Sequence, residues 1–157
     1  MTATARKVLS DLEAAHEMLE IESNAERFRV MWVAAMALSR AVGHVLHKVD
    51  SLAGPRVKAA IDQAYASWKA EPEKHRIFHC FIEDERNAVL KEYEMGFMSG
   101  HAAFVVLPGM SLTTLPDELF CPLIDGPYQG EDCRDVLAIA IGWWHAELRE
   151  IDHAAAA

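Results

Sequence analysis

The sequence contains few cysteines, and their arrangement argues against a disulfide-stabilised scaffold. Three are present, Cys80, Cys121 and Cys133, so the number is odd, and no Cys-x-x-Cys spacing occurs. Small secreted domains carry paired cysteines, whereas proteins of the cytosol keep their thiols reduced. We therefore expect this chain to work in a reducing cytoplasm.

Long apolar runs are also missing. The N-terminal twenty residues lack the apolar stretch of a signal peptide. The longest stretch without Asp, Glu, Lys or Arg, residues 95–116, is interrupted by glycine and proline, which a continuous membrane helix does not tolerate. The apolar runs at residues 30–39 and 136–146 are too short to span a bilayer. We expect a cytoplasmic protein without membrane contact.

Positively charged residues are fewer than negatively charged ones. The chain has 15 Lys and Arg against 24 Asp and Glu, a formal net charge of -9. Such a chain repels phosphates over most of its surface, so any contact with a polyanion must be local. One modest basic cluster offers such a surface, and it consists of Arg40, Lys48, Arg56 and Lys58 with His44 and His47 between them.

The short signatures of common catalytic sites are absent. The chain has no Gly-rich phosphate loop, no Gly-x-Ser-x-Gly and no Cys–His nucleophile pair. The spacings His44/His47 and His75/His79/Glu83 would each suit a metal on one helix face. The second pattern lacks the central Glu of a zinc-protease helix, and eight histidines make such spacings common. We expect no metal and no cofactor.

What the sequence does contain is helical periodicity. Its 157 residues are 52% hydrophobic, enough for a single domain with a real core. Apolar residues at helical spacing predict helices over residues 5–21, 24–49, 55–69, 72–95 and 131–153. The fold class is therefore all-α, a bundle of about five helices. Residues 97–130 form a separate segment, with an irregular or β-hairpin insertion at about 100–130 before the closing helix.

Local signals place several element boundaries. Ser23 and Glu26 form a capping-box pattern, with Ser23 as the N-cap of the second helix. Gly96 is placed as the residue that follows the fourth helix. A weak alternation over residues 101–115, with a Pro-Gly turn at 108–109, predicts a short hairpin.

The end of the fourth predicted helix carries the side chains best suited to catalysis or ligand binding. On an ideal helix Arg86 and Tyr93, seven residues apart, share a face, and His79 and Glu83 lie on the same stripe. The stripe combines a proton carrier, a carboxylate, a fixed cation and a phenol. Arg holds phosphate or carboxylate groups bidentately, and His is a general base near neutral pH.

Arg86, Asn87 and Tyr93 resemble the signature of HEPN domains (higher eukaryotes and prokaryotes nucleotide-binding domains) over residues 5–96. That signature has Arg, a polar residue, a spacer and His, and one toxin subgroup adds Tyr two residues after the His. The resemblance implies an all-α homodimer, in a family with many RNases of toxin–antitoxin or defence systems. Lys91 stands where the family has its His, and the pKa of a lysine is too high for a general base at neutral pH.

Three functions follow as hypotheses. The first is a non-catalytic homodimer that binds a nucleotide, RNA or a protein partner such as an antitoxin, with Arg86, Arg40 and His44 as the ligand-binding residues. The second is a diverged, metal-independent RNase whose candidate catalytic residues are Arg86, Asn87 and Tyr93, with His79 and Lys91. The third is a structural interaction protein without a ligand site.

The aromatic residues leave a further alternative open. Aromatic residues at helical spacing build either a plain core or the wall of a ligand pocket. The candidates are Trp32, Trp68, Trp143, Trp144, Phe28, Phe78, Phe81 and Tyr65. Trp143 and Trp144 are about 100° apart on an ideal helix. We expect one of them to cover a second surface, such as a dimer interface.

Overall fold

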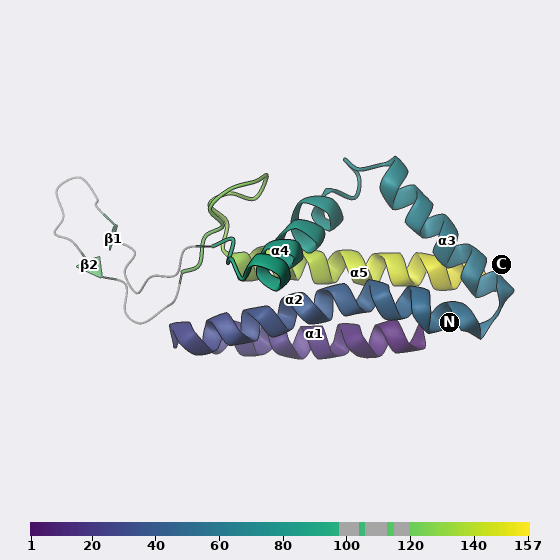
Figure 1. Ribbon diagram of the computed structural model, residues 1–157, viewed down its shortest axis with the longest axis horizontal. Helices are drawn as coiled ribbons and strands as arrows, with labels where there is room; N and C mark the ends of the chain where they lie inside the picture. Colours follow the sequence, from purple (N-terminus) through teal and green to yellow (C-terminus); the bar gives the residue numbers. More distant parts are fainter. Residues whose placement is uncertain (98–103, 106–112, 115–119) are drawn as a thin grey trace.

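The computed structural model describes residues 1–97, 104–105, 113–114 and 120–157, and within them the fold is all-α (Figure 1). The long helices are α1 (Ala3–Ile21), α2 (Ala25–Lys48), α3 (Pro55–Ala70) and α5 (Cys133–Ala156), and a 3-10 turn η1 (Asp50–Ala53) links α2 to α3. Residues 76–92 are helical throughout and form the fourth element, hereafter the α4 segment. The prediction of roughly five helices in a bundle is confirmed.

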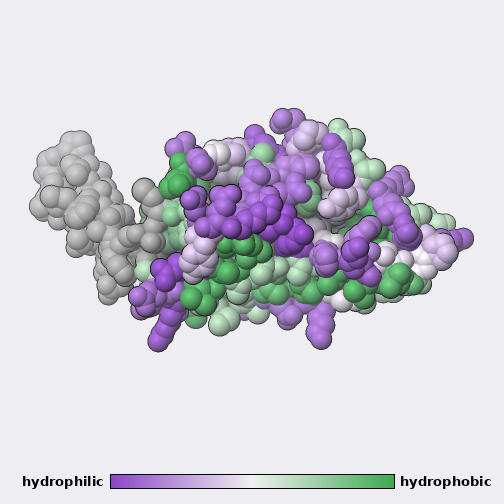
Figure 2. Space-filling model, in the orientation of Figure 1, coloured by the Kyte–Doolittle hydropathy of each residue, from purple (hydrophilic) through white to green (hydrophobic). Residues whose placement is uncertain are grey.

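Helices α1, α2 and α5 lie side by side along the long axis, and α3 and the α4 segment lean over one side of that layer (Figure 1). The core of this layer contains Leu9 and Leu12 of α1, Trp32 of α2 and Leu148 of α5, all of which are buried. On the face seen in Figure 2, hydrophilic residues gather over the α4 segment, and a hydrophobic band runs below it over α1 and α2.

The start of α2 corrects one predicted boundary. Ser23 is not the N-cap; that residue is Asn24, whose Oδ1 accepts hydrogen bonds from the backbone N–H groups of Glu26 (3.1 Å) and Arg27 (3.0 Å). Glu22 takes the reciprocal role expected of Glu26, because its Oε1 accepts from the Asn24 N–H at 2.8 Å. Asn and Ser are about equally good N-caps, so the sequence pattern does not decide between two such neighbours.

The fourth helix differs most from its prediction as one α-helix over residues 72–95. Residues 72–75 form a turn. The α4 segment then alternates between wide π windings, η2 (Phe78–Glu83) and η3 (Ala88–Glu92), and a single α turn, α4 (Asp84–Asn87). It ends at Tyr93, which adopts the left-handed conformation (φ 57°), and not at Gly96. A π winding has more residues per turn than an α-helix, so a spacing of seven no longer marks one face.

The insertion before α5 contains a short antiparallel ladder. Strand β1 (Phe104–Val105) pairs with β2 (Thr113–Thr114), in the register Phe104 with Thr114 and Val105 with Thr113. This pairing agrees with the predicted hairpin. Its predicted turn at residues 108–109 lies outside the described residues.

One helical run, Ala25–Ala53, meets the length and composition of a membrane span, with a mean hydropathy of 1.2 in its most apolar window. The sequence analysis expected no such run because it counted only stretches uninterrupted by charge. The core helix of a soluble protein passes the same test, and 33% of that window is buried inside this fold.

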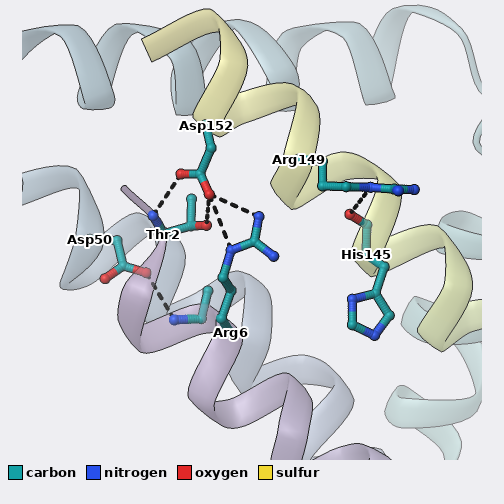
Figure 3. A network of polar contacts seen from close by, with 7 residues as sticks. Thr2, Arg6, Asp50, His145, Arg149 and Asp152 are labelled. Carbon is teal, nitrogen blue, oxygen red and sulfur yellow. Dashed lines mark hydrogen bonds and ion pairs between the residues drawn. The ribbon is translucent and has the colours of Figure 1, made fainter. Parts of the chain in front are cut away.

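Two carboxylates hold the start of α1 in place (Figure 3). Asp50 of η1 accepts hydrogen bonds from the backbone N–H groups of Thr4 (3.0 Å) and Ala5 (2.9 Å). Asp152 of α5 accepts from the N–H and hydroxyl groups of Thr2 and from the guanidinium of Arg6, which it meets at 2.8 Å. The first turn of α1 has no side-chain cap of its own, so these acids satisfy N–H groups that would otherwise lack acceptors.

The Asp152 carboxylate gives a pH-dependent test. Burial opposes its ionisation, but the hydrogen bonds from Arg6 and Thr2 outweigh burial and hold its pKa below the usual value. A carboxyl group whose pKa is lower in the folded than in the unfolded chain stabilises the fold fully above the ordinary carboxyl pKa of about 4. This stabilisation is lost as the pH falls through the folded-state pKa. Asp152→Asn should therefore lower the free energy of unfolding by about 1 kcal/mol at pH 7.

Urea denaturation between pH 7 and pH 3 measures this difference. The gap between the wild type and Asp152→Asn should shrink as the pH falls below about 4. Glu150→Gln, an exposed substitution on the same helix, is the control and should leave the stability unchanged. A gap that is constant over the whole pH range would contradict the assignment.

Candidate functional site

A cavity of about 510 Å³ lies between α2, α3, the α4 segment and α5. Its apolar wall includes Tyr65 of α3, Phe78 of the α4 segment and Trp144 of α5. Its remaining lining residues are Ser39, Arg40, Gly43, His44, His47, Asp62, Ala66, Lys69, Ile82, Glu83 and Arg86. A volume between about 300 and 1,000 Å³ with an aromatic wall and a few polar groups is typical of small-molecule sites.

Two guanidinium groups face this cavity from different elements. Arg40 comes from α2 and Arg86 from the α turn of the α4 segment. Burial lowers the pKa of Arg86, and the positive charge of Arg40 lowers it further. Within the described part of the chain neither side chain has an ion pair or a hydrogen bond. The cavity therefore holds two neighbouring positive charges that protein groups leave without a direct partner.

The acids of the cavity do not neutralise these cations directly. Asp62 forms an ion pair with Lys58, one turn before it on α3. Glu83 accepts a hydrogen bond from the ring of His79 at 3.1 Å. The third cation of the lining, Lys69, lies over the Tyr65 ring, with its Nζ 5.3 Å from the ring centre. Each carboxylate thus already has a direct partner, while Arg40 and Arg86 do not, although the charge of Glu83 favours the charged form of Arg86.

Two buried polar atoms on the cavity wall also lack a partner among the described residues. They are the hydroxyl oxygen of Ser39 and the indole Nε1 of Trp144, and both side chains are 1% exposed. Buried polar groups in folded proteins are almost always hydrogen-bonded.

The three predicted ligand-binding residues come together here. Arg86, Arg40 and His44 all line the cavity, and His47 joins them one turn further along α2. The other members of the basic cluster, Lys48, Arg56 and Lys58, are not part of the lining. An i, i+4, i+7 spacing along α2 explains why Arg40, His44 and His47 share one face.

The predicted catalytic stripe does not converge in the structure. Among His79, Glu83, Arg86 and Tyr93, only Glu83 and Arg86 line the cavity. His79 bonds to the Trp68 carbonyl at 3.0 Å as well as to Glu83, and Tyr93 is 63% exposed beyond the end of the α4 segment. The π windings rotate Tyr93 away from the direction that an ideal helix predicts.

The remaining predicted catalytic residues also lie away from the lining. Lys91 is exposed in the last π winding. Asn87 is half-buried next to Arg86, and its Oδ1 has no partner among the described residues. Neither residue belongs to the cavity wall.

The sequence analysis missed several residues of the site. Ser39, Tyr65, Lys69 and Trp144 line the cavity, but only the aromatic pair had been considered as part of a pocket. One of Trp143 and Trp144 was expected to cover a second surface. Trp144 is buried, and Trp143 is half-buried and packs with its ring centre 5.0 Å from that of Trp68. Both tryptophans of α5 therefore join one aromatic cluster.

Neither metal spacing forms a ligand cluster. No group of three or more His, Cys, Asp or Glu side chains suited to a metal ion occurs in the ranges that the structure describes. His44 and His47 are instead exposed on the cavity, and His75 is buried against Trp143 and Glu147.

Comparison of the chain with protein-family models, with curated proteins and with solved structures finds no match.

A buried carboxyl group fixes the end of the α4 segment near this site. Glu85 accepts hydrogen bonds at its Oε1 from the Trp32 indole (2.9 Å) and from the Gly96 N–H (3.1 Å). Burial raises its pKa above the ordinary carboxyl value, and the two hydrogen bonds counteract only part of that rise. Gly96 approaches so closely that a Cβ there would collide with Glu85 Oε2.

Gly96→Ala should therefore lower the free energy of unfolding by about 1–3 kcal/mol, because the added methyl group must displace a buried, hydrogen-bonded carboxyl. Gly142→Ala is the matched control, since a Cβ at that position of α5 meets nothing within 4 Å. It should be neutral or raise stability by up to about 1 kcal/mol. Urea denaturation compares the two, and equal effects would contradict the contact.

Proposed function

We propose that this chain is a helical binding module that takes a phosphate-bearing ligand of nucleotide size into the cavity between α2, α3 and the α4 segment. The observation that carries the proposal is the pair of guanidinium groups, Arg40 and Arg86, on one cavity without an ion pair or a hydrogen bond among the described residues. Arg presents a planar fork of donors that matches phosphate oxygens bidentately.

The cavity offers a complementary surface for the rest of such a ligand. Tyr65, Phe78 and Trp144 supply flat apolar area against which a planar ring system packs favourably. Together with the two guanidinium groups, this surface supports a small organic phosphate rather than a free inorganic ion.

The charge of the whole molecule favours a short ligand over a long nucleic acid. The formal net charge is -9, yet three cations and two already paired carboxylates line the cavity. A long RNA strand would lie over the acidic surroundings as well, whereas a mononucleotide would meet only the local excess of positive charge. The proposal agrees with the nucleotide-binding role that the HEPN resemblance implies. The homodimer, the antitoxin partner and the cytoplasmic location stay predictions.

A diverged ribonuclease is the second candidate. His44 and His47 are exposed imidazoles on the same cavity as Arg86, so a proton carrier and a phosphate-binding cation are present there although Lys91 replaces the family His. This pairing differs from the predicted one, because His79 and Tyr93 take no part in it. Metal-independent cleavage of RNA would require one of these histidines as the base.

The test of binding uses isothermal titration calorimetry with adenosine monophosphate at low salt. Arg40→Gln and Arg86→Gln should each weaken binding about 10- to 100-fold, because each removes a charge-assisted hydrogen-bond donor. Arg29→Gln, an exposed substitution on α2 outside the cavity, is the matched control and should bind like the wild type. Absence of binding by the wild type, or equal losses in all three variants, would overturn the proposal.

The second candidate is distinguished by incubating the wild type with RNA in the presence of a chelator. Cleavage that disappears in His44→Gln and persists in His153→Gln, an exposed histidine at the end of α5, would favour the ribonuclease. We expect nucleotide binding without cleavage.

A further inference from the structure

The start of α5 and the chain that precedes it form a short antiparallel bridge. Pro122 pairs with Asp132, and the flanking hydrogen bonds run from the Leu123 N–H to the Glu131 carbonyl and from the Cys133 N–H to the Cys121 carbonyl, both at 2.9 Å. This register places Cys121 directly opposite Cys133.

The register sets the separation of the two cysteines. Opposite residues of an antiparallel pair have Cα atoms about 4.5–5.5 Å apart. Disulfides join Cα atoms about 4.4–6.8 Å apart, so this register brings the two residues into the range of a disulfide. Both side chains are fully buried, and both thiols are free.

A clamp of polar contacts fixes this geometry. Asp132 accepts a hydrogen bond from the Cys121 N–H at 3.0 Å and also caps α5 through the Arg134 N–H at 2.9 Å. The Arg134 guanidinium binds both oxygens of the same carboxylate, at 2.8 and 2.9 Å. These contacts hold Cys121 and Cys133 opposite each other, so the two thiols are adjacent without a movement of the backbone.

The two thiols differ in their readiness to ionise. A hydrogen bond from Cys133 lowers the pKa of the Cys121 thiol, against the opposing effects of burial and of the Asp132 charge. Burial, together with the adjacent Cys121, raises the pKa of the Cys133 thiol. Reactive pairs of this kind contain one attacking thiolate and one resolving thiol.

We propose that Cys121 and Cys133 form a reversible intramolecular disulfide when a hydroperoxide reaches the pair. The Cys121 thiolate attacks one oxygen of hydrogen peroxide, the O–O bond breaks, and the released hydroxide takes up a proton to give water and a sulfenic acid. The Cys133 sulfur then attacks the Cys121 sulfur, the S–O bond breaks, and a second water leaves. Two thiols and one peroxide thus yield one disulfide and two waters.

The disulfide would join Cys121, which precedes the bridge, to Cys133 in the first turn of α5 and would close the short loop between them. Because the cross-link restricts the unfolded chain, the oxidised protein should melt several degrees higher than the reduced protein. This inference is independent of ligand binding, since neither cysteine lines the cavity.

The test treats the 157-residue chain with hydrogen peroxide in steps, denatures it, alkylates the remaining thiols and maps the peptides by mass spectrometry. The wild type should lose two alkylatable thiols and yield one cross-linked peptide pair joining Cys121 to Cys133, which a reductant separates. Cys121→Ser and Cys133→Ser should each abolish the cross-link. Cys80→Ser, which removes the half-buried cysteine of the α4 segment, is the matched control and should leave it intact.

Cys80 also serves as an internal reference for oxidant exposure. The proposal is overturned if Cys121 and Cys133 both remain alkylatable at a peroxide concentration that oxidises Cys80. It is equally overturned if the cross-links found are only intermolecular, or if the Cys121→Ser and Cys133→Ser proteins still form an intramolecular disulfide in the same amount.

Discussion

The packing of Trp68 against the α4 segment and α5 is the contact on which the candidate site depends. The Trp68 ring lies 5.3 Å from Phe78 and 5.7 Å from Trp144, measured between ring centres, and its indole donates to Glu147 at 2.6 Å. Aromatic groups of this size contribute the largest buried areas in a core and prefer such edge-on and tilted arrangements. These aromatic contacts hold α3 and the α4 segment against α5 (Figure 1). The cavity lies between these elements and α2.

This arrangement leaves positive charge concentrated where the fold itself does not neutralise it. Stability alone would favour a close carboxylate partner for the half-buried Arg86, because burial and the charge of the exposed Arg40 both disfavour its charged form. Instead Asp62 pairs with Lys58, and Glu83 bonds to His79, so that Glu83 acts on Arg86 only through its charge and not through a direct contact. Charged groups in unfavourable surroundings, whose cost is offset by stabilising contacts elsewhere in the fold, are characteristic of functional sites. The proposed ligand would supply the missing negative charge.

The sequence predicted the helices better than it predicted the site. Buried side chains at helical spacing, such as Leu12 and Leu19, placed α1 within two residues of its observed start. Arg40 and His44 were predicted together as members of one basic cluster, and the regular helix α2 places both on one face. The association of Arg86 with Tyr93 rested on regular helical spacing, which the π windings of the α4 segment interrupt. Ser39 and Lys69 share helix faces with other lining residues of α2 and α3. The sequence does not show that these faces and Trp144 surround one cavity, because that depends on tertiary packing.

The most direct test of the central claim is anomalous diffraction from crystals of the protein soaked in tungstate, a heavy tetrahedral oxyanion that stands in for phosphate. The account predicts one strong anomalous peak inside the cavity, within hydrogen-bond distance of both Arg40 and Arg86. The peak should disappear in crystals of Arg86→Gln. Tungstate bound only elsewhere on the protein, or a cavity closed by carboxylates that pair with both guanidinium groups, would contradict it.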